Sequence, residues 1–460
     1  MKKSKFIHPD IRKIMTNKTK KRTINEIRQT KDSVYKTEPQ KKFFNSDYKR
    51  VASHEARPGT FTKVLLLYSG GLDTSVITKH IQEEYNADVY CLCVGIGQTD
   101  DVEYIRDKAL KLGAKKFEYA DVTQEFAETV CRQAIKANVN YEDGYRLFCP
   151  LGRVQISKTA VEYAEKWGCE VIAHGCTGKG NDQIRFENYV TTLNPELKIL
   201  APVREWEMGR EQELAYAADR NIPIEQSSEK IYSYDENIWG CSAEGGEIEI
   251  LSEIPKLKNI LKHVNVPEET PDEPEFVDIM FSRGEAIAIN GYTCSAKTCI
   301  EDMNKIGAKH GVGITHLIED RVMGLKVRGV YEEPGAEILI QAHMALEKLV
   351  CTREEYMHKQ SIDQQWTNMV YEGRWFHPLM HHLNAYIDSV NKKVSGIVTM
   401  KIYKTKAECV AIKSKYQLFE EEAATFMSGG TFNQNASAGF IEHFGYSQRV
   451  GYNKSKELYS

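Results

Sequence analysis

The chain of 460 residues has a net charge of −4, and its hydrophobic and charged fractions, 41% and 27%, are typical of a globular protein with two or three domains. No apolar run approaches the roughly 20 residues that span a bilayer, and the N-terminus lacks a signal-peptide core, so we expect a cytoplasmic protein with no membrane partner. The eleven cysteines are scattered without a CxxC pair, which favours reduced thiols.

The N-terminal segment carries a charge opposite to that of the remainder. Residues 1–60 hold 17 Lys and Arg against 6 Asp and Glu, a charge of +11, so the other 400 residues carry −15 to give the total of −4. Apolar residues are too sparse here for an independent core, and we predict a flexible basic extension. Docking on an acidic surface is the favoured role, and nucleic-acid binding or targeting is less favoured.

From Lys63 onward, apolar runs alternate with amphipathic segments. KVLLLYS, ADVYCLCVGI, KKFEYADV and EVIAHG indicate buried strands, and helices are expected at about 74–84, 100–113, 123–138 and 151–167. This alternation indicates βαβ units with right-handed crossovers. We therefore predict an α/β fold over residues 61–234, with a doubly wound parallel sheet.

A different pattern begins near residue 235. Strand-like stretches, EFVDIMFSRGEAIAING and GLKVRGVYEEPGA, surround a long helical run over 336–366. KVSGIVTMKIYKTKAECVAIKS then alternates as a hairpin does. We predict an α+β domain over 235–425 and a C-terminal segment over 426–460.

The stretch LLLYSGGLDTS joins the first strand to a helix expected to begin at Asp73 or Thr74. Helix N-termini attract phosphate through their unpaired N–H groups and the helix dipole, and glycine permits close approach. The junction supplies hydroxyl and carboxylate groups as well, from Ser69, Asp73, Thr74 and Ser75. It matches neither a Walker A motif nor GxGxxG. We predict a phosphate site here rather than an ordinary capped glycine turn.

The pattern SGGxDxS resembles the loop of the N-type ATP pyrophosphatases, which implies ATP, with Mg²⁺, as the cofactor. Four further motifs are similar to the argininosuccinate synthase family: AHGCTGKGNDQIRFE, YSYDENIWGCSAEGG, KHGVGITHLIEDRVMGLKVRGVYEEPGA and FNQNASAGFIEHFGYSQRV. The resemblance runs in order from about residue 63 to 450. It implies a ligase in which the citrulline ureido oxygen attacks the α-phosphate of ATP, after which the aspartate amine displaces AMP to form argininosuccinate.

The resemblance also implies roles for individual residues. ATP would be bound by Leu67, Tyr68, Ser69, Gly70, Gly71, Leu72, Asp73, Thr74, Ser75, Val94 and Gly175. Aspartate would be bound by Thr177, Asn181 and Asp182. The acceptor would be bound by Tyr145, Pro150, Asn181, Arg185, Ser233, Ser242, Glu244, Glu319 and Tyr331. Ser69, Asp73, Ser75, Asp182 and Arg185 are expected to act in the chemistry, and no protein side chain is assigned as a metal ligand.

One segment departs from the family pattern, because Phe148-Cys149-Pro150 replaces Gly-Thr-Ser and Gly152 replaces the alanine before Arg153. Proline has no N–H and a thiol is a weak donor, so hydrogen bonds to the acceptor carboxylate would be lost unless Arg146 compensates. Two interpretations follow: a synthase that binds citrulline differently, or a paralogue that joins aspartate to another ureido or amide acceptor.

Other functional classes are less favoured. Cys149 would suit tRNA thiolation, but no partner cysteine for a relay is evident, and a non-catalytic nucleotide-binding scaffold would not be expected to keep SGGLDTS whole. In WFHPLMHH, Pro378 favours a helix start with exposed His377 and His381 over a metal site. The aromatic tail from Phe426 resembles the family's intersubunit segment, which implies a homotetramer.

Overall fold

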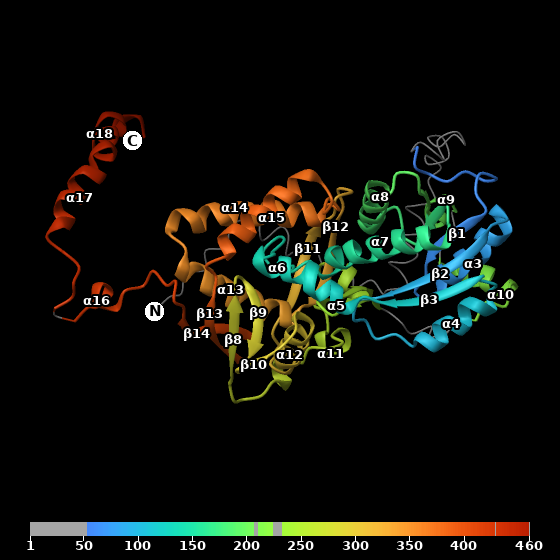
Figure 1. Ribbon diagram of the computed structural model, residues 1–460, viewed down its shortest axis with the longest axis horizontal. Helices are drawn as coiled ribbons and strands as arrows, with labels where there is room; N and C mark the ends of the chain where they lie inside the picture. The colour runs from blue at the N-terminus through green and yellow to red at the C-terminus, as the bar shows by residue number, and fades with distance from the viewer. Residues whose placement is uncertain (1–52, 207–209, 224–231, 428, 460) are drawn as a thin grey trace, which may run out of the picture. The chain divides into compact units, whose positions relative to one another are not determined.

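The computed structural model describes residues 53–206, 210–223, 232–427 and 429–459 (Figure 1). Most of the basic extension predicted over residues 1–60 lies outside these ranges. None of the helices in the described ranges combines the length and the apolar character that crossing a membrane requires.

A parallel sheet confirms the predicted doubly wound fold. Its strands are β1 (Lys63–Leu67), β2 (Asp88–Gly95), β3 (Lys116–Asp121), β4 (Val171–Ala173) and β5 (Lys198–Leu200). All pair in parallel, in the order β3-β2-β1-β4-β5. Because β2 and β4 flank β1 on opposite sides, the strand order reverses between β1 and β4, where sheets of this kind bind ligands at their carboxyl ends.

Helices cover both faces of this sheet. The helices of this region are α3 (Leu72–Tyr85), α4 (Val102–Lys111), α5 (Thr123–Phe126), α6 (Arg132–Lys136), α7 (Phe148–Trp167), α8 (Asp182–Leu193), α9 (Pro202–Glu205) and α10 (Arg210–Asp219), with a π-helical turn over Ala127–Cys131, and α6 packs against the second domain instead of the sheet. Alternate strand residues face opposite ways: Leu65 packs in one core cluster with Leu151 of α7, and Leu66 in another with Ile77 of α3. Burial on both faces explains why the strands are continuous apolar runs.

Two antiparallel sheets follow. One has the order β11-β12-β7-β6, from β6 (Tyr232–Asn237), β7 (Gly240–Gly245), β11 (Ile314–Asp320) and β12 (Lys326–Glu332). The other has the order β10-β9-β8-β13-β14, from β8 (Glu275–Ser282), β9 (Glu285–Ile289), β10 (Tyr292–Thr293), β13 (Gly396–Tyr403) and β14 (Lys406–Lys413). The predicted hairpin is β13–β14. The domain boundary at residue 235 stays a prediction.

The helical run predicted over 336–366 is two helices, α13 (Pro334–Val350) and α14 (Arg353–Tyr371). Thr352 begins α14 with a capping box, because its hydroxyl accepts from the Glu355 N–H and the Glu355 carboxylate accepts from the Thr352 N–H. The other helices are α11 (Leu257–Ile260), α12 (Ala296–Lys309), α15 (Pro378–Asn391), α16 (Glu421–Ala424), α17 (Ala436–Phe444) and α18 (Tyr446–Ser455), with 3₁₀ turns over Gly246–Glu249, Pro267–Glu269 and Lys456–Leu458.

The expectation that all cysteines are reduced is wrong for one pair. Cys294 and Cys299 form a disulfide at the start of α12, with their Cα atoms 6.0 Å apart. The turn into α12 brings together two thiols whose spacing in sequence matches no familiar motif. The other nine cysteines are free thiols.

Candidate active site

The loop between β1 and α3 has the backbone geometry of a phosphate site. Gly70 adopts a φ of +76°, and Gly71 is the N-cap of α3, where no side chain caps the first turn. The helix begins at Leu72, slightly earlier than predicted, so Asp73 lies in the first turn and is not the cap. N–H groups and the positive end of a helix dipole therefore gather at the carboxyl end of β1.

Neighbouring side chains support the loop. The Lys108 ammonium donates to the Gly70 carbonyl over 2.6 Å, and the Ser75 hydroxyl donates to the Gly71 carbonyl over 2.6 Å. The hydroxyls of Ser69 and Thr74 lie 3.4 Å apart, and the Tyr68 hydroxyl lies 3.3 Å from Ser75 Oγ. These contacts support the conformation of the loop.

The remaining residues of the ATP set lie on neighbouring strand ends. A Cβ added to Gly175, just beyond β4, would lie 3.6 Å from Thr74 Cγ2 and 4.0 Å from Asp73 Cβ. Val94 is near the end of β2, where its carbonyl accepts from the Gln98 amide over 2.8 Å. Leu67 pairs with Leu92 in the β1–β2 register.

The residues expected to bind aspartate lie at the N-terminus of α8. Asn181 is the N-cap of this helix, Asp182 is its first residue, and the exposed Thr177 lies in the preceding loop. The His174 ring supports that loop, because its Nδ1 accepts from the Cys176 N–H over 3.3 Å.

Two guanidinium groups hold the Asp182 carboxylate. Arg153 donates to Oδ2 through Nε and Nη2, at 3.0 and 2.9 Å, and Arg185 donates to Oδ1 over 2.9 Å. Burial alone would raise the pKa of Asp182, but Arg153 and Arg185 outweigh it and hold that pKa below its ordinary value. Arg153 also forms an ion pair with Asp235 on β6, which joins the first domain to the next sheet.

The expected acceptor residues Glu319 and Tyr331 meet across the β11–β12 hairpin. Tyr331 donates its hydroxyl to Glu319 Oε2, and its ring lies 4.5 Å from that of Tyr145, between centroids. Glu319 and Asn181 are also joined, at 3.4 Å. All four residues are buried, so the structure brings together four residues of the acceptor set, one of which, Asn181, belongs to the aspartate set as well.

Sequence reasoning missed Tyr371, the last residue of α14. Its hydroxyl lies 2.5 Å from Glu319 Oε1 and 2.9 Å from Asn181 Nδ2. No motif that we recognised contains Tyr371, and the run around it indicated only a helix.

Three other expected acceptor residues, Ser233, Ser242 and Glu244, lie on the same sheet as Glu319 and Tyr331. Ser242 pairs with Tyr331 in the β7–β12 register, and Ser233 pairs with Glu244 in the β6–β7 register. Glu244 forms an ion pair with Arg321 at 3.0 Å, and burial raises its pKa despite that partner. The Ser233 side chain is exposed, and among the described residues no hydrogen bond joins its hydroxyl to the buried group.

The segment that departs from the family pattern begins α7. Cys149 Sγ lies 3.5 Å from Asp182 Oδ1 and 3.8 Å from Arg185 Nη1, so its thiol borders both amino-acid sets. Phe148 is fully buried beside Tyr145 and Tyr331, and Pro150 is buried as well.

Arg146 does not compensate for the lost donors. Its guanidinium pairs with Glu337 at 2.7 Å and donates to the Val139 carbonyl over 2.9 Å, so it is used within the core. A buried nitrogen of Arg185, Nη2, has no hydrogen-bond partner among the described residues. Arg185 is therefore the better candidate for binding an acceptor anion.

Among the described residues, two clusters of Cys, His and acidic side chains are close enough together to hold a metal ion, and each already has a cationic side chain beside it. Glu236, Cys241 and His263 could hold a metal by geometry, but Lys262 already pairs with Glu236, and Arg153 lies within the cluster of Cys149, Asp182 and Asp235.

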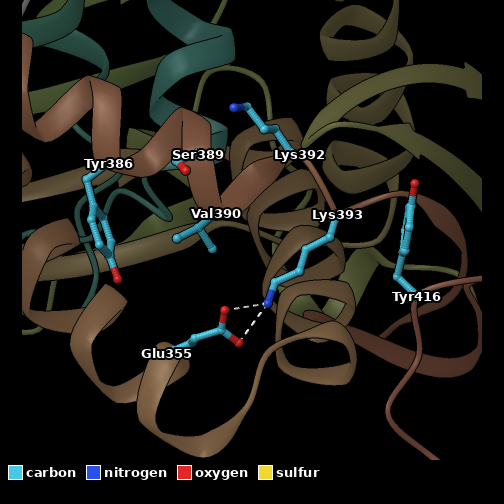
Figure 2. Close-up of a pocket in the computed structure, with 7 residues that line it drawn as sticks. All are labelled: Glu355, Tyr386, Ser389, Val390, Lys392, Lys393 and Tyr416. Atoms are coloured by element: carbon cyan, nitrogen blue, oxygen red, sulfur yellow. Dashed lines mark hydrogen bonds and ion pairs between the residues drawn. The ribbon is translucent and has the colours of Figure 1, made fainter.

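His377 and His381 are exposed around the start of α15, as predicted, and His377 caps that helix. A cavity of about 590 Å³ lies elsewhere, and none of the expected site residues lines it. Figure 2 shows the residues that do: Glu355, Tyr386, Ser389, Val390, Lys392, Lys393 and Tyr416.

Comparison with known proteins assigns the family. The model of the arginosuccinate synthase N-terminal HUP domain matches residues 63–223, and that of the arginosuccinate synthase C-terminal domain matches residues 232–451. The chain belongs to the argininosuccinate synthase family. It is therefore an enzyme of the carbon–nitrogen ligase class.

Named members of the argininosuccinate synthase family align over most of their length. The argininosuccinate synthase of Caldanaerobacter subterraneus subsp. tengcongensis is 44% identical over 84% of this chain and 95% of its own length. Those of Pyrococcus furiosus and Clostridium botulinum are 45% and 43% identical, over 86% and 83% of this chain and 96% and 94% of their own lengths.

The phosphate loop can be tested at Gly70. A Cβ there would lie 2.8 Å from Ile105 Cγ1, so we expect Gly70→Ala to displace the loop and raise the KM for ATP at least about tenfold. Gly59→Ala is the matched control, because Gly59 has a φ of +74° but nothing within 4 Å of its Cβ position. Steady-state kinetics that show equal KM values for ATP in both variants would contradict the assignment.

Proposed function

We propose that this chain condenses citrulline with aspartate and releases AMP and pyrophosphate, forming argininosuccinate through an adenylated ureido intermediate. The observation that carries the proposal is the contact between two expected substrate-binding groups: Asn181, the N-cap of α8 in the domain whose parallel sheet ends in the phosphate loop, lies 3.4 Å from Glu319 on the antiparallel sheet, where Tyr331 contacts the same carboxylate. The name that the relatives share favours this reaction over a different acceptor or a non-catalytic scaffold.

The phosphate loop would bind ATP through the N–H groups that begin α3 and the hydroxyls of Ser69 and Thr74. Asp73 lies in the first turn beside Gly175, where a carboxylate suits a cation that accompanies phosphates, so this residue would hold Mg²⁺. The ion would supply positive charge to the phosphates as pyrophosphate leaves.

The two amino acids would be held side by side, which supplies the proximity on which the reaction depends. Glu319 offers a buried carboxylate to the acceptor's ammonium group, and Arg185 offers a guanidinium to its carboxylate. Asp182 would orient the aspartate amine. Burial raises the pKa of Asp182 by less than Arg153 and Arg185 lower it, so this pKa stays below its ordinary value. Asp182 is therefore a poor base and would not accept the proton of the aspartate amine.

Product analysis tests the proposed reaction. The chain is incubated with Mg-ATP and aspartate, with and without citrulline, while AMP and pyrophosphate are quantified and argininosuccinate is sought by mass spectrometry. We expect citrulline-dependent release of both products in equal amounts. AMP formation that needs aspartate and some other ureido or amide compound would overturn citrulline as the acceptor.

A substitution at Cys149 tests the segment Phe148-Cys149-Pro150, which departs from the family pattern. A substitution at the buried Phe148 would disturb the protein more, because it would leave a cavity in the core. Cys149→Ser places a stronger donor at the same position, so we expect the KM for citrulline to fall about threefold to tenfold. Cys409→Ser, at an exposed cysteine, serves as the control for the same chemical change. An unchanged KM for citrulline would show that the thiol does not limit acceptor binding.

We further propose a cytoplasmic homotetramer in which the C-terminal segment 426–460 packs between subunits. Helices α17 and α18 have no buried residue, and large apolar side chains are exposed along the segment: Phe426, Phe432, Phe440, Ile441, Phe444 and Tyr452. Apolar surface of this extent is typical of an interface.

Sedimentation analysis tests this assembly. We expect a tetramer for the full chain and a smaller species for a chain truncated after Thr425. A truncated chain that remains tetrameric would rule out the segment as the determinant of assembly.

A further inference from the structure

Tyr371 joins residues from both amino-acid sets, although it lies far from each of them in sequence. It ends α14, whereas Asn181 precedes α8 and Glu319 lies on β11. Its hydroxyl approaches Asn181 Nδ2, Glu319 Oε1 and the Asp320 carbonyl, at 2.9, 2.5 and 2.9 Å.

The hydrogen bond that Asn181 accepts from Val322 determines the direction of the bonds at the Tyr371 hydroxyl. The Asn181 amide oxygen accepts from the Val322 N–H over 2.9 Å, so its NH₂ group must face Tyr371. The Tyr371 oxygen therefore accepts from Asn181, and its single proton is free for the closest acceptor, Glu319. Burial raises the pKa of Tyr371, which keeps that proton on the hydroxyl. With Tyr331, two phenols donate to one carboxylate.

The backbone carbonyl and the ring of Tyr371 both contact the Arg185 guanidinium. Its carbonyl accepts from Arg185 Nε over 3.0 Å, and the guanidinium lies 5.0 Å from the centroid of its ring. The ring stacks on Tyr141, with centroids 3.8 Å apart and planes at 11°. A Cβ on Gly373 would lie 2.9 Å from Arg185 Cα, so the end of α14 packs closely against α8.

We propose that Tyr371 is a positioning residue that couples the aspartate and acceptor sites. Its hydroxyl holds Asn181 and Glu319 in fixed relation, while its carbonyl and ring orient Arg185. This inference rests on the proposed function, since it assumes that these three residues bind the two amino acids. No group of Tyr371 contacts the loop between β1 and α3 in the described interactions, so ATP binding should be independent of it.

Tyr371→Phe tests the proposal, because it removes the hydroxyl and keeps the ring and the carbonyl. One hydrogen bond to a buried charged group accounts for about a tenfold or greater change in affinity. We expect the KM values for citrulline and for aspartate each to rise about tenfold, with the KM for ATP changed less than about twofold. A purely structural role would move all three values together.

Tyr189→Phe is the matched control. Tyr189 is a buried tyrosine on α8, the helix that carries Asp182 and Arg185, and its hydroxyl has no side-chain hydrogen-bond partner among the described residues. We expect its removal to leave the three KM values unchanged.

A double-mutant cycle with Glu319→Gln asks whether Tyr371 acts through Glu319. If it does, the double variant raises the KM for citrulline by less than the product of the two single effects. Multiplicative effects, unchanged KM values for both amino acids, a parallel rise in the KM for ATP, or a Tyr371→Phe chain that fails to fold would each overturn the proposal.

Calorimetric titration of aspartate into the parent chain and Tyr371→Phe separates this inference from the proposed function. We expect binding to the variant to be about tenfold weaker. A parent chain that binds aspartate but forms no argininosuccinate would refute the reaction alone. Equal affinities for aspartate in the two chains would refute the role of Tyr371 alone.

Discussion

The ion cluster around Asp182 is the constraint on which the site depends. Arg153 from α7 and Arg185 from α8 each form an ion pair with the Asp182 carboxylate, and Arg153 also pairs with Asp235 from β6. Two cations therefore balance two anions in a partly buried cluster. Removing one member of such a cluster leaves a buried charge without its counterpart, which is far more costly than losing an exposed pair. The cluster therefore aligns the first domain with the sheet that carries Glu319 and Tyr331.

The polar groups of the site orient one another. Glu319 is held by two tyrosines, Asn181 by the Val322 N–H and Tyr371, and Asp182 by two arginines. Groups fixed in this way need little rearrangement when charge develops during a reaction, which is the advantage of a preorganised site. In this chain Cys149 lies within that arrangement, where the family pattern has a threonine.

The phosphate loop and the parallel sheet could be predicted because their signals are local. Buried strands are apolar runs, and Gly70 and Gly71 mark the turn that follows the first of them. The β5 strand has only three residues, too few to show a pattern, and the pairing of β6 with β7 depends on partners elsewhere in the fold. Thr352 and Glu355 form a recognisable capping box, but the surrounding helical pattern concealed it. The Cys294–Cys299 pair and Tyr371 depend on tertiary contacts that spacing does not reveal.

The break between α13 and α14 at Thr352 determines where the end of α14, with Tyr371, lies. As one continuous helix, residues 334–371 would extend about 57 Å at 1.5 Å per residue. Tyr371 would then lie far from β12, the strand that leads into α13. Because α13 ends and α14 begins at this capping box, the end of α14 instead lies near the β11–β12 hairpin, where Tyr371 and Tyr331 donate to the same Glu319 carboxylate. A helix-start signal of four residues, Thr352 to Glu355, thus allows two tyrosines forty positions apart in sequence to contact one carboxylate of the candidate site.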